Sequence, residues 1–316
     1  MSVLNRIPAR LLVSCAAVLA AAAALTFVPS AGAARVGSTY LALGDSLAYG
    51  FHEAQFAEEF PNVKPATFEE GYVDDFADLL KLVNPKLTLI NDGCPGETTE
   101  SLIHGSGING FCAGGPHGTP FPYAFLHHPY KGSSQLADAL AILHENPKVS
   151  PITLDIGAND LLQFIASQCG FPAADSCSEA QFTGEFEHIA ANVVFILSQL
   201  RAAAPNAQIV LVGIYNPFPD FPAQGSDKLT TGLDAALSAA ASKVPGTSFA
   251  DPEPLFNPSI ILGGSETADD TTICAFTAMC PGGSFNPTSP QADIHPTKLG
   301  YQVMSGVLAV TFLTHF

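Results

Sequence analysis

Strand-like and helix-like segments alternate along the chain from residue 38 onward, and this alternation constrains the fold more than any other feature. The segment Gln208–Ile214 is almost wholly apolar, as expected for a parallel strand with both faces buried. The segment before it, Gly184–Ala204, has apolar residues at helical spacing. The same reading predicts strands over Ser38–Leu43, Leu87–Asn91, Ile152–Ile156 and Thr247–Ala250, and helices over Tyr72–Val83, Gln135–Glu145, Lys228–Val244 and Pro296–Phe316. Because no internal repeat or linker divides the chain, the pattern predicts one doubly wound α/β domain.

Two long segments interrupt this alternation, His104–Lys131 and Pro252–Ala292. Both are rich in Gly, Pro and aromatic residues, and both contain cysteines. Irregular stretches of this length in a compact domain are usually functional loops or disordered segments. Since the cysteines favour order, we expect two ordered loops.

The N-terminus has the three-part layout of a secretory signal peptide. Arg6 and Arg10 precede an Ala-rich apolar run, Leu11–Val28, and small residues near Ala33 form an A-x-A cleavage site after Pro29. The alternative is a transmembrane anchor, but alanine is weakly hydrophobic and an anchor does not end in proline and a cleavage site. The sequence therefore predicts a signal peptide at residues 1–33, a secreted domain at residues 34–316, and no stable membrane insertion.

Cysteine usage agrees with export. Of seven cysteines, Cys15 lies in the predicted signal peptide, which leaves six. Short loops close at the lowest entropic cost, so neighbours in the sequence are expected to form disulfides. The expected pairs are Cys94 with Cys112, Cys169 with Cys177, and Cys274 with Cys280. A zinc site is the alternative, but the cysteines lack the C-x2-C spacing and flanking histidines of such sites.

The charge balance excludes one class of partner. The chain has 12 Lys and Arg against 29 Asp and Glu, a formal net charge of −17. Nucleic acid is therefore not expected to bind, because the protein lacks a basic surface that releases counterions. Hydrophobic residues make up 47% of the chain, which is enough for a large core.

Four short polar blocks stand at the ends of predicted strands or before the last helix. They are Gly44–Leu47, Asn91–Thr98, Gly157–Asp160 and Asp293–Pro296. The first places Ser46 in a tight turn directly after a strand. Open α/β sheets bind ligands at the carboxyl edge, where such turns gather. The blocks therefore mark one edge of the sheet as the candidate functional site.

These blocks, in this order, resemble those of the SGNH hydrolases, also called the GDSL esterase/lipase family, in its secreted bacterial form. The resemblance covers essentially the whole of the chain after the predicted signal peptide. It implies a single three-layer domain with a mostly parallel, five-stranded, flavodoxin-like sheet flanked by helices. It also implies a serine esterase or lipase that needs no cofactor.

The resemblance assigns roles residue by residue. Ser46 is the expected nucleophile and His295 the base that takes its proton, since imidazole titrates near neutral pH. The negative charge of a tetrahedral intermediate needs prearranged donors, which map onto the backbone N–H groups of Ser46 and Gly96 and the side chain of Asn159. Asp160 is expected to cap a helix rather than to act in catalysis.

The last block departs from the family pattern, in which an acid lies three residues before the histidine. Ala292 occupies that position here, and the nearest acid, Asp293, lies two residues before His295. Either Asp293 reaches the imidazole through a local bulge, or a backbone carbonyl near Ala292 orients it instead, because that role needs an acceptor rather than a charge. The sequence leaves both arrangements open.

Two other patterns are discounted. Residues 105–110 spell G-x-G-x-x-G, but the segment follows no strand and opens no helix, so no dinucleotide is expected. The pair His127-His128 has no carboxylate or third histidine at ligand spacing, so no metal is expected there.

The substrate is less constrained by the sequence. The Phe- and Pro-rich segments Pro120–Tyr130 and Asn216–Pro222 either line an apolar acyl groove or simply cover the core. We expect a monomeric carboxylic ester hydrolase, an esterase or lipase. The alternatives are a carbohydrate O-deacetylase of the same fold and, from another class, a catalytically silent surface-binding module.

Overall fold

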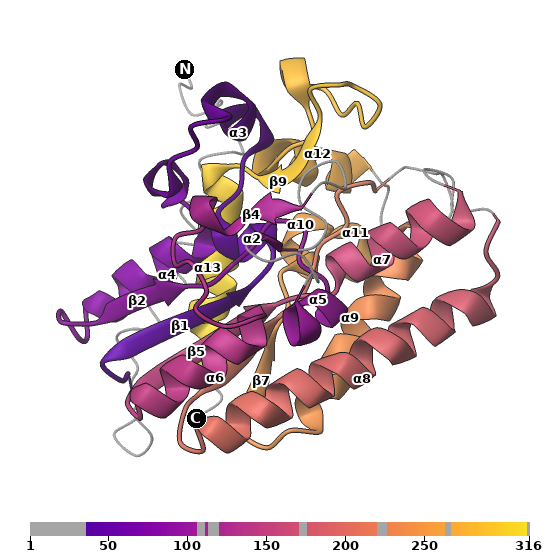
Figure 1. Ribbon diagram of the computed structural model, residues 1–316. Coiled ribbons are helices and arrows are strands. Elements are labelled where there is room, and N and C mark those ends of the chain that lie inside the picture. Colours follow the sequence, from indigo (N-terminus) through magenta and orange to yellow (C-terminus); the bar gives the residue numbers. More distant parts are fainter. Residues whose placement is uncertain are drawn as a thin grey trace, which may run out of the picture.

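The computed structural model describes residues 36–105, 111–112, 120–170, 176–219, 226–262 and 267–314. The predicted signal peptide and most of the G-x-G-x-x-G segment lie outside these residues. A five-stranded sheet forms the centre, with strand order β2-β1-β5-β6-β7 and parallel pairing throughout (Figure 1). The strands are β1 (Thr39–Gly44), β2 (Thr88–Asn91), β5 (Val149–Asp155), β6 (Ile209–Val212) and β7 (Thr247–Ala250). The doubly wound α/β fold predicted from the alternation is confirmed.

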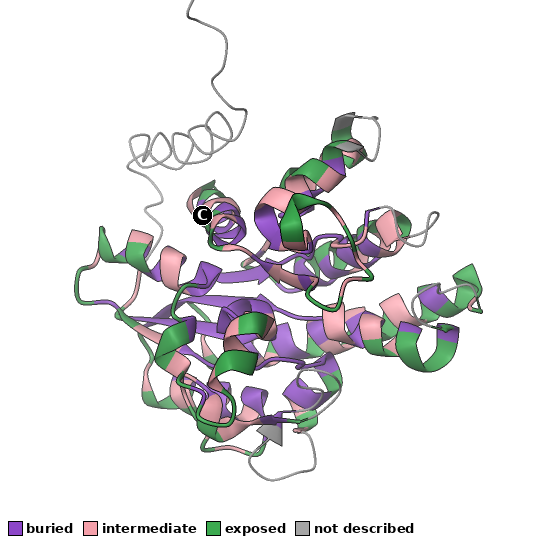
Figure 2. Cartoon of the chain, turned by 90° about the horizontal axis from the view of Figure 1, so that it is seen from above, coloured by how far each residue is buried: buried purple, intermediate pink, exposed green. Residues whose placement is uncertain are grey.

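Each face of the sheet packs against its own layer of helices. Alternate residues of one strand point to opposite faces, so Leu41 and Leu43 join one core while Tyr40 and Ala42 join the other. Figure 2 shows the strands as a buried layer between the helices. The three layers explain why β6 is apolar on both faces.

The helices divide between the two cores. One core contains residues of α5 (Thr99–His104), α6 (Gln135–Glu145), α7 (Ala158–Phe164), α8 (Glu179–Ala203) and α9 (Ser226–Ser242). The other contains residues of α2 (Ser46–Tyr49), α4 (Tyr72–Lys81), α10 (Glu253–Phe256), α12 (Thr267–Phe276) and α13 (Lys298–Thr314). No helix among the residues described here combines the length and the apolar character needed to cross a membrane.

The sequence placed the start of α8 too late. The helix begins at Glu179 rather than Gly184. Ser178 and Gln181 form a capping box, in which the backbone N–H of Ser178 donates to the Gln181 side chain at 3.0 Å. This local signal outweighs the weak apolar periodicity of the first helical turn.

The segment Pro252–Ala292 also differs from the loop expected for it. It contains α10, α11 (Ser259–Leu262), α12 and the short strand β8 (Thr277–Ala278), which pairs with β9 (Asp293–Pro296). Proline and glycine made it look irregular, but Ile273 and Phe276 of α12 are buried against the sheet. The segment also contains the helical turn Pro281–Gly283. Smaller elements elsewhere are α3 (Glu53–Glu59), the helical turns Pro65–Phe68, Tyr123–Phe125 and Ile165–Cys169, and the strand pair β3 (Phe111–Cys112) and β4 (Phe121–Pro122).

Three disulfides join the pairs of neighbouring cysteines. The bonds link Cys94 to Cys112, Cys169 to Cys177, and Cys274 to Cys280. The first of them ties the loop after β2 to β3, and the third ties α12 to the segment before β9. Two of the cross-links therefore fasten segments that lead into the blocks at the carboxyl edge.

Candidate active site

The turn after β1 exposes one residue. Every residue from Thr39 to Phe51 is buried except Ser46, which begins α2 and is partly exposed. Asp45 caps the helix, since its carboxylate accepts the Leu47 N–H at 2.9 Å. Gly44 has φ +142°, and a side chain there would lie 2.3 Å from the Asp155 carbonyl oxygen. Glycine and the cap together bend the chain so that Ser46 faces solvent.

The block after β2 is fastened to this turn by backbone and side-chain hydrogen bonds. The Cys94 N–H donates to the Gly44 carbonyl at 3.0 Å, and the Asn91 side chain donates to the Ala48 carbonyl at 2.8 Å. Two residues beyond Cys94, Gly96 has φ +83°, a conformation that favours glycine. The structure thus places the Gly96 backbone beside the strand end that carries Ser46.

Asn159 joins both segments from the first turn of α7. Its side-chain amide donates to the Asp45 carboxylate at 3.1 Å and to the Glu97 carbonyl at 3.0 Å. These two acceptors match the two N–H bonds of the amide. Asn159 therefore lies between the residues that flank Ser46 and Gly96.

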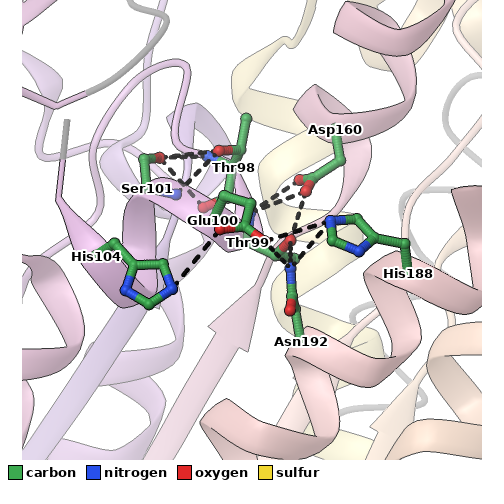
Figure 3. Close-up of polar contacts among 8 residues, drawn as sticks. All are labelled: Thr98, Thr99, Glu100, Ser101, His104, Asp160, His188 and Asn192. Carbon is green, nitrogen blue, oxygen red and sulfur yellow. Dashed lines mark hydrogen bonds and ion pairs between the residues drawn. The ribbon is translucent and has the colours of Figure 1, made fainter. Parts of the chain in front are cut away.

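Asp160 acts as an anchor between helices (Figure 3). Its carboxylate accepts the Thr99 backbone N–H at 3.0 Å and the Thr99 hydroxyl at 2.5 Å. Burial raises the pKa of Asp160 to about 6, although these bonds favour the carboxylate. It thus caps the start of α5, as expected from the sequence, but it does so from the start of α7.

Asp293 reaches the imidazole of His295. The two lie in β9, and the Asp293 Oδ1 is 2.5 Å from the His295 Nδ1 and accepts the His295 backbone N–H at 3.0 Å. The other oxygen accepts the Glu53 N–H at 2.9 Å. Burial opposes ionisation of Asp293, but His295 and these hydrogen bonds lower its pKa to about 2. Of the two arrangements that the sequence left open, the structure therefore has the carboxylate.

Ser46, Asn159 and His295 line one pocket, which opens to solvent. Most of its wall is apolar: Leu47, Leu161, Leu162, Ile165, Ile214, Pro217, Phe218, Leu229 and Ile294 contribute. The segment from Asn216 to Phe218 lies in this wall, whereas Phe121, Leu126 and the half-buried Phe125 pack in a separate core with Tyr49 and Phe51. Of the two Phe- and Pro-rich segments, one thus lines the pocket and the other covers a core.

Sequence reasoning missed a pair of buried carboxyl groups beneath Ser46. Asp155, at the end of β5, accepts the Asp45 backbone N–H at 3.2 Å and the Tyr72 hydroxyl at 2.5 Å. Burial and the adjacent Asp45 raise the pKa of Asp155 well above its usual range, because two neighbouring carboxylates repel each other. Burial and the neighbouring carboxylate therefore favour the protonated form of Asp155. The only signal in the sequence was an acidic residue in an otherwise apolar strand.

A third buried acid follows Gly96. Glu97 receives a hydrogen bond from Ser101 and one from the Gln135 amide at 3.3 Å. Burial and the charges of Asp45 and Asp160 raise its pKa to about 8. Gln135 also bonds both the N–H of Gly44, at 2.7 Å, and its carbonyl, at 2.9 Å. The floor of the site is thus a network of buried acids with raised pKa values and of amides that hydrogen-bond to them.

The protonated form of Asp155 predicts a pH dependence of stability. Its pKa is raised in the folded protein, so the folded state holds a proton that the unfolded chain releases above about pH 4. The free energy of unfolding therefore falls as the pH rises, by up to about 1.4 kcal/mol per pH unit from this group. Asp155→Asn should make the fall between pH 5 and pH 8 shallower, as measured by urea unfolding at both pH values. Equal slopes in the two proteins would contradict the raised pKa of Asp155.

Sequence comparison decides the family. The GDSL-like lipase/acylhydrolase family matches residues 42–303. The chain belongs to this family. The match spans the blocks that hold Ser46, Gly96, Asn159 and His295, and so confirms the resemblance inferred from those blocks. No curated protein matches the chain.

Solved structures of this GDSL-family fold cover nearly the whole chain at low sequence identity. An extracellular lipase from Streptomyces rimosus aligns with a TM-score of 0.54 and 16% identity, covering 87% of this chain and 99% of that one. A lipase from a goat rumen metagenome aligns with a TM-score of 0.51 and 21% identity, covering 85% and 95%. An acetylxylan esterase from Geobacillus stearothermophilus aligns with a TM-score of 0.51 and 13% identity, covering 88% and 96%. These similarities establish the fold.

Proposed function

We propose that this GDSL-family protein is a secreted serine esterase or lipase that hydrolyses carboxylic esters through an acyl-enzyme on Ser46. One observation carries the proposal: Ser46 is the partly exposed residue of a buried turn and shares an apolar pocket with His295, whose Nδ1 lies 2.5 Å from Asp293. A nucleophile, a base and an acid that orients the base form the arrangement that acyl transfer requires.

The reaction follows from these positions. The Ser46 Oγ attacks the ester carbonyl while the His295 Nε2 takes its proton, and His295 then gives that proton to the departing alcohol. Water, deprotonated by His295, releases the acid from Ser46, and the proton returns to the serine. Asp293 fixes the tautomer that carries hydrogen on Nδ1 and leaves Nε2 free. None of these steps uses a cofactor.

The oxyanion is bound by the backbone N–H groups of Ser46 and Gly96 and by the Asn159 amide. Asn159→Ala should lower kcat by roughly 10²–10³ with little change in KM, because the donor acts on charge that develops only in the transition state. Steady-state kinetics measures this effect, and a thermal melt checks that the lost bonds to Asp45 and Glu97 have not unfolded the site. A rise in KM at constant kcat would assign Asn159 to substrate binding instead.

The apolar wall of the pocket favours an acyl chain longer than acetyl. The wall beside Ser46 is formed by leucine side chains of α7 and α9, by Ile165, and by the segment after β6. Each methylene buried there contributes about 0.8 kcal/mol. The structural neighbours include both lipases and an acetylxylan esterase, so the fold alone does not choose between them. The pocket supports the esterase or lipase over the deacetylase.

Initial rates on p-nitrophenyl esters from acetyl to palmitoyl, with acetylated xylan as a second substrate, test this proposal. We expect kcat/KM to rise about threefold to fourfold per methylene until the chain outgrows the pocket. Leu229→Trp, which fills the pocket, should reduce rates on long esters far more than on acetate. Leu255→Trp, at an exposed site outside the pocket, is the matched control. Preference for acetylated xylan would establish the deacetylase, and no hydrolysis of any ester would leave the silent binding module.

Secretion is part of the same proposal. Three disulfides suit an oxidising compartment. Cleavage after residue 33 leaves the domain at residues 34–316, acting as a monomer on an ester substrate. Mass spectrometry of the protein from the culture medium should find the new N-terminus at Ala34. An uncleaved chain in the membrane fraction would favour the anchor.

A further inference from the structure

Three side chains outside the catalytic machinery converge at the same edge of the sheet. Asp92 follows β2, His128 lies in the loop before α6, and Asp138 lies in the first turn of α6. One ligand atom of each lies within 4.8 Å of the other two. The histidine pair at residues 127–128 had no carboxylate nearby in the sequence, but the fold brings two to one of its members.

The distances place the His128 ring between the two carboxylates. Its Nδ1 is 2.7 Å from the Asp92 Oδ1 and 3.4 Å from the Asp138 Oδ2. The Asp138 Oδ1 accepts the Lys131 backbone N–H at 2.6 Å, which fixes the direction of that carboxylate. His127, in contrast, turns away, with its Nε2 2.9 Å from the Tyr49 carbonyl.

Two carboxylate oxygens of this group lack a hydrogen-bond donor. Among the residues that the structure describes, none donates to the Asp92 Oδ2 or the Asp138 Oδ2. The two side chains are 0% and 1% exposed. Buried carboxylate oxygens are normally satisfied, since leaving them without a partner is costly. The Nδ1–H of His128 donates to one oxygen at a time, so His128 does not supply a hydrogen bond to every carboxylate oxygen of the group.

Inside the buried group itself, a divalent cation would balance the charges. The charged groups that act on the imidazole are Asp92, Asp138 and the exposed Lys131. A protonated His128 leaves one negative charge unpaired inside the group. A divalent cation bound by two carboxylates and a neutral imidazole makes the buried group neutral, which favours burial.

We propose that Asp92, His128 and Asp138 bind a divalent transition-metal cation, Zn²⁺ in preference to Ca²⁺ or Mg²⁺. A mixed nitrogen and oxygen ligand set suits Zn²⁺, whereas Ca²⁺ takes six to eight oxygen ligands. Ligand atoms around tetrahedral Zn²⁺ lie about 3.4 Å apart, close to the spacing already present between His128 and Asp138. Binding at Nδ1 releases its proton to solvent and leaves the hydrogen on Nε2. The imidazole is 30% exposed, which leaves a path of entry.

The position of the site assigns it a structural role. The Tyr130 hydroxyl donates to the Asp92 carbonyl at 2.5 Å and accepts from the Gln135 amide at 2.8 Å. Gln135 in turn holds both backbone groups of Gly44, beside Ser46. A cation joining β2, the loop and α6 braces the strand ends on which the candidate active site is built.

Calorimetric titration of the EDTA-dialysed protein with ZnCl₂ tests the proposal. We expect one Zn²⁺ per chain and, at 100 times the Kd, a rise in melting temperature on the order of 5 °C. Asp138→Asn keeps the shape of the side chain and the hydrogen bond that it accepts from Lys131. It should weaken Zn²⁺ binding by more than about 100-fold, a larger loss than is typical when a residue that only hydrogen-bonds to a metal ligand is replaced. His128→Gln provides a second ligand deletion at a part-exposed position, should the buried change unfold the protein.

A surface group supplies the matched control. His104 and His188 flank the exposed Glu100, with nitrogen to oxygen distances of 3.7 and 3.3 Å (Figure 3). His188→Gln should leave the Zn²⁺ isotherm unchanged. Loss of binding in this variant but not in Asp138→Asn would show adventitious surface binding and overturn the proposal. Tighter binding of CaCl₂ or MgCl₂ than of ZnCl₂, or no binding by the wild-type protein, would overturn it as well.

Discussion

Replacing Ser46 with alanine is expected to lower kcat for ester hydrolysis by roughly 10⁶, the loss typical when the nucleophile of a serine hydrolase is removed. The fold should be unaffected, because the Asp45 cap and the buried residues of the turn do not depend on the hydroxyl. A fluorophosphonate probe should label the wild-type protein irreversibly at Ser46 and should not label the variant. Peptide mass spectrometry of the labelled protein identifies the site.

The pocket itself offers the control for this experiment. Ser226 also lines it, but its hydroxyl donates to the Phe218 carbonyl at 2.7 Å and accepts from the Asn216 amide at 3.0 Å. Ser226→Ala should therefore keep activity within about tenfold and retain full labelling. A Ser46→Ala protein that still hydrolyses esters, with the label on Ser226 or another serine, would show that the nucleophile lies elsewhere.

The arrangement of strand ends was predictable from the sequence, because parallel strands end at one edge. Residues that follow β1, β2 and β5 must lie near each other once those strands are neighbours, and the sheet order makes them so. Ser46, Gly96 and Asn159 each stand directly after one of these strands. Periodicity and turn chemistry were sufficient to place them on the correct segments.

The contacts within that edge were not predictable. Asp155 looked like an interruption of an apolar strand, and only the fold shows that it lies against Asp45 and Tyr72. Asp92 and Asp138 do not lie at metal-ligand spacing from His128 in the sequence, so no sequence motif includes all three residues. Such pairings depend on how β2, a loop and α6 pack together, and periodicity carries no information about side-chain distances across elements.

Asp293 shows the same limit in the catalytic segment. The spacing to His295 was one residue short of the family pattern, so the sequence left the orienting group open. In the structure, the Asp293 Oδ1 contacts both the backbone N–H and the Nδ1 of His295 within β9. A two-residue spacing reaches the ring because the carboxylate points forward along the chain, where it also accepts the His295 backbone N–H.

If Asp293 orients the base, Asp293→Asn should lower kcat by about 10⁴, as when the acid of a serine-protease triad is replaced by its amide. The amide donates a hydrogen bond where the carboxylate accepted one. The imidazole therefore carries its hydrogen on Nε2, which can no longer accept the serine proton. Because the pKa of Asp293 is about 2, the carboxylate is ionised throughout the working range of pH. The acid limb of the pH–rate profile should therefore not report the titration of Asp293.

The decisive measurement compares kcat for Asp293→Asn with kcat for His295→Ala under the same conditions, with melting temperatures to check folding. The Glu53 N–H contact makes folding a real concern, since Asp293 also accepts from that residue at 2.9 Å. A loss of about 10⁴ for Asp293→Asn, beside one of about 10⁶ for His295→Ala, establishes a Ser–His–Asp triad. A loss for Asp293→Asn of only about tenfold makes the pair Ser46 and His295 a dyad, with the 2.5 Å contact contributing to the structure of β9 rather than to the reaction.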